Sequence, residues 1–182
     1  NKKNMIKSLS IIFPVFNEEL RLKSSFNHIS SFLKKKKKFK IQIIFVDDGS
    51  VDNSYSLINE FIKNYKNFKT KNKVKFQIIK SSKNLGKGSA LKLGVNKSTH
   101  DWILTADIDM SVSLFQICQW MEKKSINKKY FVYFGSRKSE KSIVESKFSR
   151  KILGGIMSLL KLIILNIKIK DTQCGYKLYK KS

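Results

Sequence analysis

Acidic residues, arginine, proline and cysteine are all scarce in this sequence. Its 182 residues include 13 Asp and Glu against 38 Lys and Arg, and a single proline, Pro14. The two cysteines, Cys118 and Cys174, lie far apart without a CxxC spacing or a paired histidine. This spacing indicates neither a zinc site nor a disulfide framework, and a reducing compartment is the default expectation.

The shortage of acid leaves a formal net charge of +25, which often indicates nucleic acid or an anionic membrane as a partner. Arginine, however, occurs only at Arg21, Arg137 and Arg150, and the lysines are dispersed along the chain. No nucleic-acid partner is expected from so diffuse a pattern. The lysines reflect either a compositional bias at solvated positions or attraction to an anionic membrane surface.

A long uninterrupted apolar run is also missing. The most lipophilic stretch, residues 152–169, contains Lys161, Asn166 and Lys168 and is short for a bilayer crossing. It predicts a helix that either packs in the core or lies at a membrane interface. The sequence stops directly after the motif-like "CGYKLYKKS", so residues 1–182 are expected to be a single catalytic domain of a longer protein.

Short apolar runs alternate with segments of helical spacing. This alternation predicts an α/β fold, in which helices flank a mostly parallel, Rossmann-like sheet. At 41% hydrophobic residues, the chain has enough apolar side chains for a core. The expected strands are residues 8–13, 41–46, 74–80, 101–106 and 130–134.

Polar motifs follow each expected strand: "PVFNEE", "DDGSVDNS", "SSKNLGKGSA", "DIDMS" and "GSR". In open α/β sheets, ligands bind in the crevice beyond the carboxyl ends of the strands. We therefore expect the five loops to converge on one edge of the sheet and to form a binding site there.

Two of these loops have more than one interpretation. Asp47-Asp48-Gly49-Ser50 is compatible with a ligand site or with a tight turn, in which Asp52 or Asn53 caps the next helix. Residues 84–88, "NLGKG", are suited to cradling phosphates at a helix N-terminus. They match neither the P-loop nor the dinucleotide fingerprint, because Ser81, Gly88 and Leu91 stand at required positions.

Asp107 and Asp109 are the strongest metal candidates. Residues i and i+2 of an extended segment point the same way, so both carboxylates could bind one Mg²⁺ or Mn²⁺ ion. Such an ion completes its shell with waters and substrate phosphates. The alternative is that one aspartate caps a helix starting near Ser111 while the other is solvated.

The motifs "PVFNEE", "VDDGSVDN", "NLGKGSALKLG", "ADID", "GSR" and "DTQCGYKLY", in this order, resemble family 2 glycosyltransferases of the GT-A fold. The resemblance covers roughly residues 8–182. Within that family, "KDTQCGYKLY" and "IIKSSKNLGKGSALKLG" are most similar to members that transfer glucose from UDP-glucose to dolichyl phosphate. Related members use GDP-mannose.

The resemblance implies a role for each motif. Pro14, Phe16, Asn17 and Glu18 would line the nucleotide pocket, Asp47 or Asp48 would reach the uracil or ribose, and Gly86, Lys87 and Gly88 would lie near the sugar-nucleotide. The metal on the diphosphate, Mg²⁺ or Mn²⁺, would be held by Asp107 and Asp109. The catalytic set would comprise Asp109 together with Arg137 and Asp171, which would border the acceptor.

The resemblance also implies an inverting transfer that yields dolichyl β-D-glucosyl phosphate for protein N-glycosylation. It implies a location at the endoplasmic reticulum membrane, with the catalytic domain facing the cytosol. Similar family members usually read D-A-D-G where this chain has Asp107, Ile108, Asp109 and Met110. Two alternatives remain open: another family 2 transferase, such as one that uses GDP-mannose, and a non-catalytic sugar-nucleotide-binding domain.

Overall fold

A computed structural model describes residues 6–35, 40–67, 74–122, 126, 130–135 and 174–181. Its contacts divide the chain into two compact units, one of Asn1–Tyr133 with Tyr176–Ser182 and one of Phe134–Gly175. The first unit contains all the strands of the sheet except the end of the strand at residues 132–134. Arg137, Asp171 and the apolar segment 152–169 lie outside the described residues.

The sheet has six strands in the order β3-β2-β1-β4-β6-β5. It confirms the α/β prediction, because β1 pairs in parallel with both β2 and β4, and β2 pairs in parallel with β3. The strands are β1 (Ser8–Val15), β2 (Lys40–Asp47), β3 (Val74–Lys80), β4 (Trp102–Thr105), β5 (Val132–Phe134) and β6 (Lys177–Lys180). The helices are α1 (Glu19–Lys35), α2 (Ser54–Asn67), α3 (Lys87–Lys97) and α4 (Gln116–Glu122).

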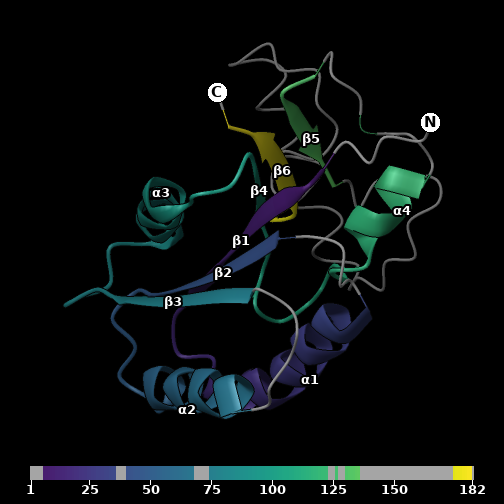
Figure 1. The fold of residues 1–182 in the computed structure, drawn as a ribbon. Coiled ribbons are helices and arrows are strands. Elements are labelled where there is room, and N and C mark those ends of the chain that lie inside the picture. The colour runs from purple at the N-terminus through teal and green to yellow at the C-terminus, as the bar shows by residue number, and fades with distance from the viewer. Residues whose placement is uncertain are drawn as a thin grey trace, which may run out of the picture. The chain divides into compact units, whose positions relative to one another are not determined.

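Helices cover both faces of the parallel strands, with α3 on one face and α1 and α2 on the other (Figure 1). Burial on both faces explains why β1 and β2 read as continuous apolar runs rather than alternating ones. On the α3 face, Ile12, Ile44 and Val46 form a cluster with Ala90. These contacts hold the start of α3 over the carboxyl ends of the strands.

The opposite face is packed with aromatic rings. Phe13 and Phe45 stack with their ring centroids 5.6 Å apart. Phe26 of α1 and Phe61 of α2 stack at 4.3 Å, and both meet Phe45 edge-on. The aromatic cluster joins the two helices to each other and to the sheet, which positions the N-termini of α1 and α2 at the same edge.

Helix α3 approaches the sheet closely at Gly94. A Cβ atom at this position would clash with Cγ2 of Ile12 and lie 3.3 Å from Cγ2 of Val46. Glycine is required here by the close approach rather than by its backbone conformation. The approach places the first turn of α3 above the edge where the strands end.

The final strand was not predicted. β6 pairs antiparallel with β4, with Leu104 opposite Leu178. It is four residues long, has a lysine at each end and contains one buried residue, Leu178, beside the partly buried Tyr179. Its segment stood out in the sequence as part of the "DTQCGYKLY" motif, and its β structure depends on the neighbouring β4. Among the described helices, none has the length and apolarity that a membrane crossing needs.

The order of the strands creates a topological switch point. From β1 the chain moves outward to β2 and β3 and then returns to place β4 on the other side of β1. Because β2 and β4 lie on opposite sides of β1, the loops at the carboxyl ends of β1 and β4 turn away from each other. This divergence opens a crevice between them. The loops after β1, β2, β3 and β4 border this crevice, as the sequence predicted for these four. The fifth predicted loop, "GSR", lies mostly outside the described residues.

Candidate active site

A cleft of about 420 Å³ lies at this edge of the sheet. Four loops contribute to it, one after each of the four parallel strands, and three of its lining residues are aspartates. The lining consists of Pro14, Val15, Phe16, Glu18, Asp48, Asn84, Gly86, Lys87, Asp107, Ile108 and Asp109. Eight of the predicted site residues are therefore brought together: Pro14, Phe16, Glu18, Asp48, Gly86, Lys87, Asp107 and Asp109.

The acid motif forms a turn, not the extended segment that the sequence suggested. β4 ends at Thr105, and the Met110 amide donates to the carbonyl of Asp107 at 3.2 Å. Asp107 and Asp109 nevertheless both line the cleft, while Ile108 between them is buried. The turn brings the two carboxylates to one site by a geometry different from the predicted i, i+2 alternation.

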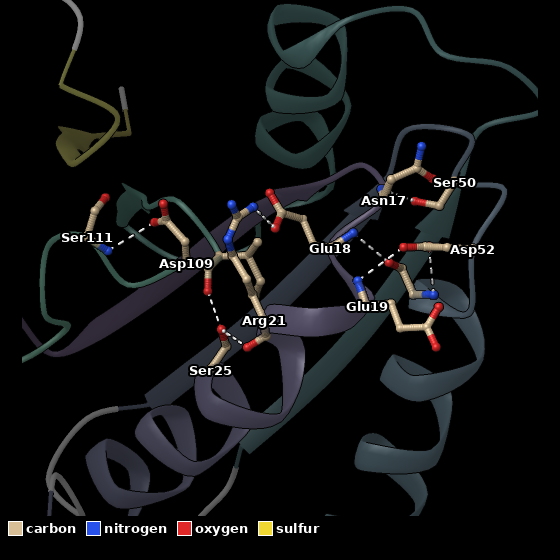
Figure 2. A network of polar contacts seen from close by, with 11 residues as sticks. Asn17, Glu18, Glu19, Arg21, Ser25, Ser50, Asp52, Asp109 and Ser111 are labelled. Carbon is tan, nitrogen blue, oxygen red and sulfur yellow. Dashed lines mark hydrogen bonds and ion pairs between the residues drawn. The ribbon is translucent and has the colours of Figure 1, made fainter. Parts of the chain in front are cut away.

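Asp109 uses one carboxylate oxygen within its own loop. Oδ1 accepts a hydrogen bond from the Ser111 amide at 3.0 Å (Figure 2). The alternative role as a helix cap is wrong for this residue, because α4 begins only at Gln116. The contact with Ser111 fixes the orientation of the carboxylate at the cleft.

Lys87, the first residue of α3, reaches across the cleft to the acid turn. Its Nζ lies 2.5 Å from Oδ1 of Asp107. The preceding Gly86 has φ 87° and ψ 156°, a backbone region open essentially to glycine alone. Gly88 is exposed in the first turn of α3 and does not belong to the cleft lining in the described part of the chain.

The two aspartates after β2 have different environments. Asp47 is fully buried, and its Oδ1 accepts from the Ser50 amide at 3.0 Å, which is the predicted turn. Asp48 is also buried but lines the cleft, and its Oδ1 accepts from the Leu85 amide at 3.0 Å. The predicted tight turn is thus confirmed at Asp47. Asp48 lines the cleft, and its contact with a ligand stays a prediction.

Gly49 holds the β2 loop against the β3 loop. Its φ is +77°, and a Cβ atom there would lie 2.6 Å from the carbonyl carbon of Lys83. A side chain is therefore excluded both by backbone conformation and by space. Together with the contact between Asp48 and Leu85, this packing sets the position of the loop that carries Lys87.

Hydrogen bonds at the N-termini of α1 and α2 join the "PVFNEE" motif after β1 to the loop after β2, and we call this set of bonds the clamp (Figure 2). The Glu18 amide donates to Ser54 Oγ at 2.8 Å, and the Glu19 amide donates to Asp52 at 3.1 Å. Asp52 also accepts from the Ser54 amide at 3.0 Å, which confirms its predicted capping position. Although burial opposes ionisation of Asp52, these bonds from Ser54 and Glu19 lower its pKa.

Asn17 belongs to this clamp rather than to the cleft lining that the described residues form. Its backbone is left-handed, with φ 53°, and its amide donates to Ser50 Oγ at 3.0 Å. Its side-chain oxygen accepts from the Val51 amide at 3.0 Å. Asn17 therefore shapes the loop between Phe16 and Glu18, both of which do line the cleft.

Arg21 lies between two acidic residues of the cleft, Glu18 and Asp109 (Figure 2). Its Nη1 is 2.7 Å from Oε2 of Glu18. The hydrogen bond and charge of Glu18 raise the pKa of the guanidinium, and the charge of Asp109 raises it further. Sequence reasoning did not select Arg21, although it directly follows the "NEE" motif.

Helix α1 supports the acid turn and the segment that follows it through two side chains that sequence reasoning also missed. Ser25 Oγ donates to the Ile108 carbonyl, and His28 Nε2 accepts from the Leu114 amide at 3.2 Å. Ring contacts of Phe115 with His28 and Phe32, at 5.6 and 5.5 Å, extend the same interface. Ser25, His28 and Phe32 recur along α1 at helical spacing. This spacing could have predicted that they share one face of the helix, but not which segment packs against that face.

One residue of the cleft was not predicted, and two predicted residues cannot be placed. Asn84, which was not selected, lines the cleft and accepts from the Gly86 amide at 2.8 Å. Arg137 and Asp171 lie outside the described residues, so their acceptor-side roles stay predictions. Within the described ranges, no group of three or more His, Cys, Asp or Glu side chains is arranged to hold a metal ion.

Comparisons with known proteins agree with this architecture. The sequence profile described as "Glycosyl transferase family 2" matches residues 10–182. The chain is 32% identical to "Dolichyl-phosphate beta-glucosyltransferase ALG5D" of Trichomonas vaginalis, over 94% of this chain and 53% of that protein. It is 33% identical to the Saccharomyces cerevisiae dolichyl-phosphate beta-glucosyltransferase, over 96% of this chain and 55% of the yeast protein. The chain thus spans about half the length of these relatives.

Solved structures share the fold at lower sequence identity. Mannosyl-3-phosphoglycerate synthase from Rubrobacter xylanophilus superposes with a TM-score of 0.61 at 11% identity, over 96% of this chain and 54% of that one. Glucosyl-3-phosphoglycerate synthase from M. tuberculosis superposes with a TM-score of 0.58 at 15% identity, over 96% and 57%. Both neighbours are GT-A glycosyltransferases, which establishes the GT-A fold of this chain.

Proposed function

Because this chain belongs to glycosyl transferase family 2, we propose that it is the catalytic part of a dolichyl-phosphate β-glucosyltransferase. It transfers glucose from UDP-glucose to dolichyl phosphate and yields dolichyl β-D-glucosyl phosphate for protein N-glycosylation. Relatives named for this activity, with about 30% identity over nearly the whole chain, support the choice of substrates.

The observation that carries the proposal is the convergence of Asp48, Lys87, Asp107 and Asp109 in one cleft at the switch point of the sheet. This cleft contains a buried carboxylate, a cation at a helix start and a pair of acids. A nucleoside diphospho-sugar needs the same three features: an acceptor for its base or ribose, and positive charge and a metal site for its diphosphate. The arrangement favours a sugar-nucleotide over a ligand without phosphates.

The acid turn fits a hard divalent cation such as Mg²⁺ or Mn²⁺. Asp107 and Asp109 present carboxylate oxygens to the cleft, the ligand type that such ions prefer. Two carboxylates suffice, because Mg²⁺ commonly completes its shell with waters and substrate phosphates rather than with an all-protein cage. When bound there, the cation would neutralise charge on the departing diphosphate.

The proposed transfer is a single inverting displacement. An oxygen of the acceptor phosphate forms a bond to the anomeric carbon of glucose, and the bond from that carbon to the β-phosphate oxygen of UDP breaks. Near neutral pH the acceptor monoester is mostly an oxyanion already, because its second pKa is about 6. The residues of the cleft therefore need to orient the donor and stabilise the leaving group more than to remove a proton.

We extend the proposal to the place of action, the endoplasmic reticulum membrane, with the catalytic cleft on the cytosolic side. A polyprenyl acceptor must be reached at a membrane surface. The relatives named for dolichyl phosphate support this location, and the excess of lysine is compatible with an anionic surface.

An assay of lipid product with an acid-turn variant tests the function. Full-length protein is incubated with radiolabelled UDP-glucose, Mn²⁺ and dolichyl phosphate, and the labelled lipid is extracted. We expect Asp109→Asn to reduce the rate at least about 100-fold, because a carboxylate ligand of the cation is lost. Circular dichroism should show an unchanged fold.

Asp101→Asn is the matched control. Asp101 is also an exposed aspartate, but it lies before β4, at the opposite end of that strand from the acid turn. Its variant should retain the wild-type rate. A wild-type rate for Asp109→Asn would refute its role in the cation site, and no labelled lipid from the wild-type protein would refute the function itself.

A further inference from the structure

Lys87 and Asp107 form an ion pair across the cleft, between the start of α3 and the acid turn. Their charged atoms are 2.5 Å apart, and their side chains are 52% and 32% exposed. The pair therefore connects the start of α3, which we expect to bind phosphate, with one of the two expected ligands of the cation. Both partners line the cleft, so neither is hidden from a bound ligand.

The oxygen that Lys87 contacts is the type of ligand that a hard cation requires. A divalent ion that binds Asp107 would meet the ammonium of Lys87 at close range, and two cations this close repel each other strongly. Occupation of Asp107 by the ion therefore favours the departure of Lys87. Because the side chain is half exposed, it can move without disrupting the core.

The start of α3 offers Lys87 an alternative partner. This helix begins without a side-chain cap, and Gly86 places its first turn directly beside the cleft. Uncapped amides at a helix N-terminus favour anions, and an ammonium on the first residue adds to that attraction. A diphosphate bound there would accept hydrogen bonds from Lys87.

We propose that Lys87 is a placeholder cation, which neutralises Asp107 until a divalent ion replaces it and which then binds the diphosphate of the sugar-nucleotide. This inference rests on the proposed function, which supplies the diphosphate. Its consequence is cooperativity: the ion releases Lys87 for the nucleotide, and the nucleotide holds Lys87 away from the ion. Each ligand therefore increases the affinity for the other.

The affinity for Mn²⁺ in the absence of nucleotide tests the first half of the proposal. Isothermal titration of full-length Lys87→Met should show Mn²⁺ binding roughly three- to tenfold tighter than wild type, because no ammonium competes for Asp107. Lys92→Met is the matched control: it removes the same charge from an exposed position of α3 outside the described cleft lining. Its affinity should remain within about twofold of wild type.

The affinity for Mn²⁺ in the presence of saturating UDP tests the second half. UDP should tighten Mn²⁺ binding to the wild-type protein several-fold more than binding to Lys87→Met, since the variant lacks the shared residue. Lys87→Gln should reproduce both effects if the methionine variant folds poorly.

Equal or weaker Mn²⁺ binding by the folded Lys87 variants, or equal UDP effects in variant and wild type, would overturn the proposal. The proposed function fails by a different result. If wild-type protein with Mn²⁺ binds neither UDP nor UDP-glucose, the donor assignment is wrong, whatever the nucleotide-free titration shows.

Discussion

Met110 and Asn17 are the two residues other than glycine that adopt a left-handed backbone in the described ranges, with φ of 55° and 53°. For most side chains this conformation costs about 1–2 kcal/mol, and asparagine tolerates it better than methionine. Met110 stands where the family resemblance led us to expect the glycine of D-A-D-G. The departure identified in the sequence is therefore a position of backbone strain, while the turn itself is retained.

Met110→Gly should relieve this strain. We expect the free energy of unfolding to rise by about 0.5–1 kcal/mol, as measured by urea denaturation, after allowance for the greater freedom of glycine in the unfolded chain. Asn17→Gly is the contrasting variant, because it also removes the oxygen that accepts from Val51. It should be destabilising. A loss of stability in Met110→Gly would show that its side-chain contacts outweigh the strain.

Gln42 is a buried polar residue that the apolar pattern of its strand does not explain. Its Oε1 accepts from Ser10 Oγ at 2.7 Å and from both the amide and the hydroxyl of Thr99, at 2.9 and 3.0 Å. Its Nε2 donates to the Lys97 carbonyl at 3.1 Å. The residue joins β1 and β2 to the chain segment that leaves α3, a role that sequence alone could not reveal.

Gln42→Leu should lower the free energy of unfolding by about 2–4 kcal/mol, because the buried Ser10 hydroxyl and the part-buried groups of Lys97 and Thr99 lose their partner at once. Thermal denaturation followed by circular dichroism would measure the change. Gln77→Leu is the control: this half-buried residue of β3 makes a single 3.5 Å contact with Gln42. If the two variants lose equal stability, the network is less important than its geometry indicates.

Among the helices, α1 carries a titratable side chain, His28, at its contact with the segment that follows the acid turn. Burial lowers the pKa of His28, whose Nε2 faces Ser113, Leu114 and the ring of Phe115. The neutral ring is therefore favoured in the folded protein. Stability is complete above the ordinary histidine pKa of about 6.5 and is lost as the pH falls from there toward the lowered folded value.

His28→Gln keeps an acceptor for the Leu114 amide but removes the titrating group. We expect the variant to lose less stability than wild type between pH 7.5 and pH 5, in urea titrations at both values. Burial lowers the pKa of His100 in the same direction, so His100→Gln should give a separate, additive reduction. Identical pH dependence in wild type and His28→Gln would rule out protonation of His28 as a source of the loss.

The contact between α3 and the sheet is set by the absence of a side chain at Gly94. Gly94→Ala should lower the free energy of unfolding by about 1–3 kcal/mol, because the new methyl group overlaps Ile12 in a packed core. Gly88→Ala lies in the same helix with no atom within 4 Å of the added carbon. It should be neutral or slightly stabilising, and chemical denaturation would separate the two. Equal effects would contradict the close approach.

The sequence was informative about elements whose signal is local. The runs at β1 and β2 are long and apolar because both faces of these strands are buried. β3 lies at the edge of the sheet and is only partly buried, yet all three strands were predicted to within two residues. β6 was missed because four residues with two lysines carry almost no local signal. Its pairing with β4 joins segments more than seventy residues apart.

Over the whole chain, the convergence of the loops after β1, β2, β3 and β4 is the feature that the sequence predicted best. It follows from topology, because parallel strands end at one edge whatever their side chains are. Individual roles were harder to predict. Asn17 and Asp47 shape loops instead of lining the cleft that the described residues form, since their oxygens accept from Val51 and Ser50. Such backbone partners become visible only when the loops are placed.

The most direct test of the proposed activity is a donor panel on the full-length protein. UDP-glucose and GDP-mannose are each supplied with dolichyl phosphate, and release of nucleoside diphosphate is measured with Mn²⁺ and with excess EDTA. We expect turnover of UDP-glucose that depends on dolichyl phosphate and that EDTA abolishes, with little turnover of GDP-mannose. Preference for GDP-mannose, turnover that persists in EDTA, or no release of UDP would contradict it.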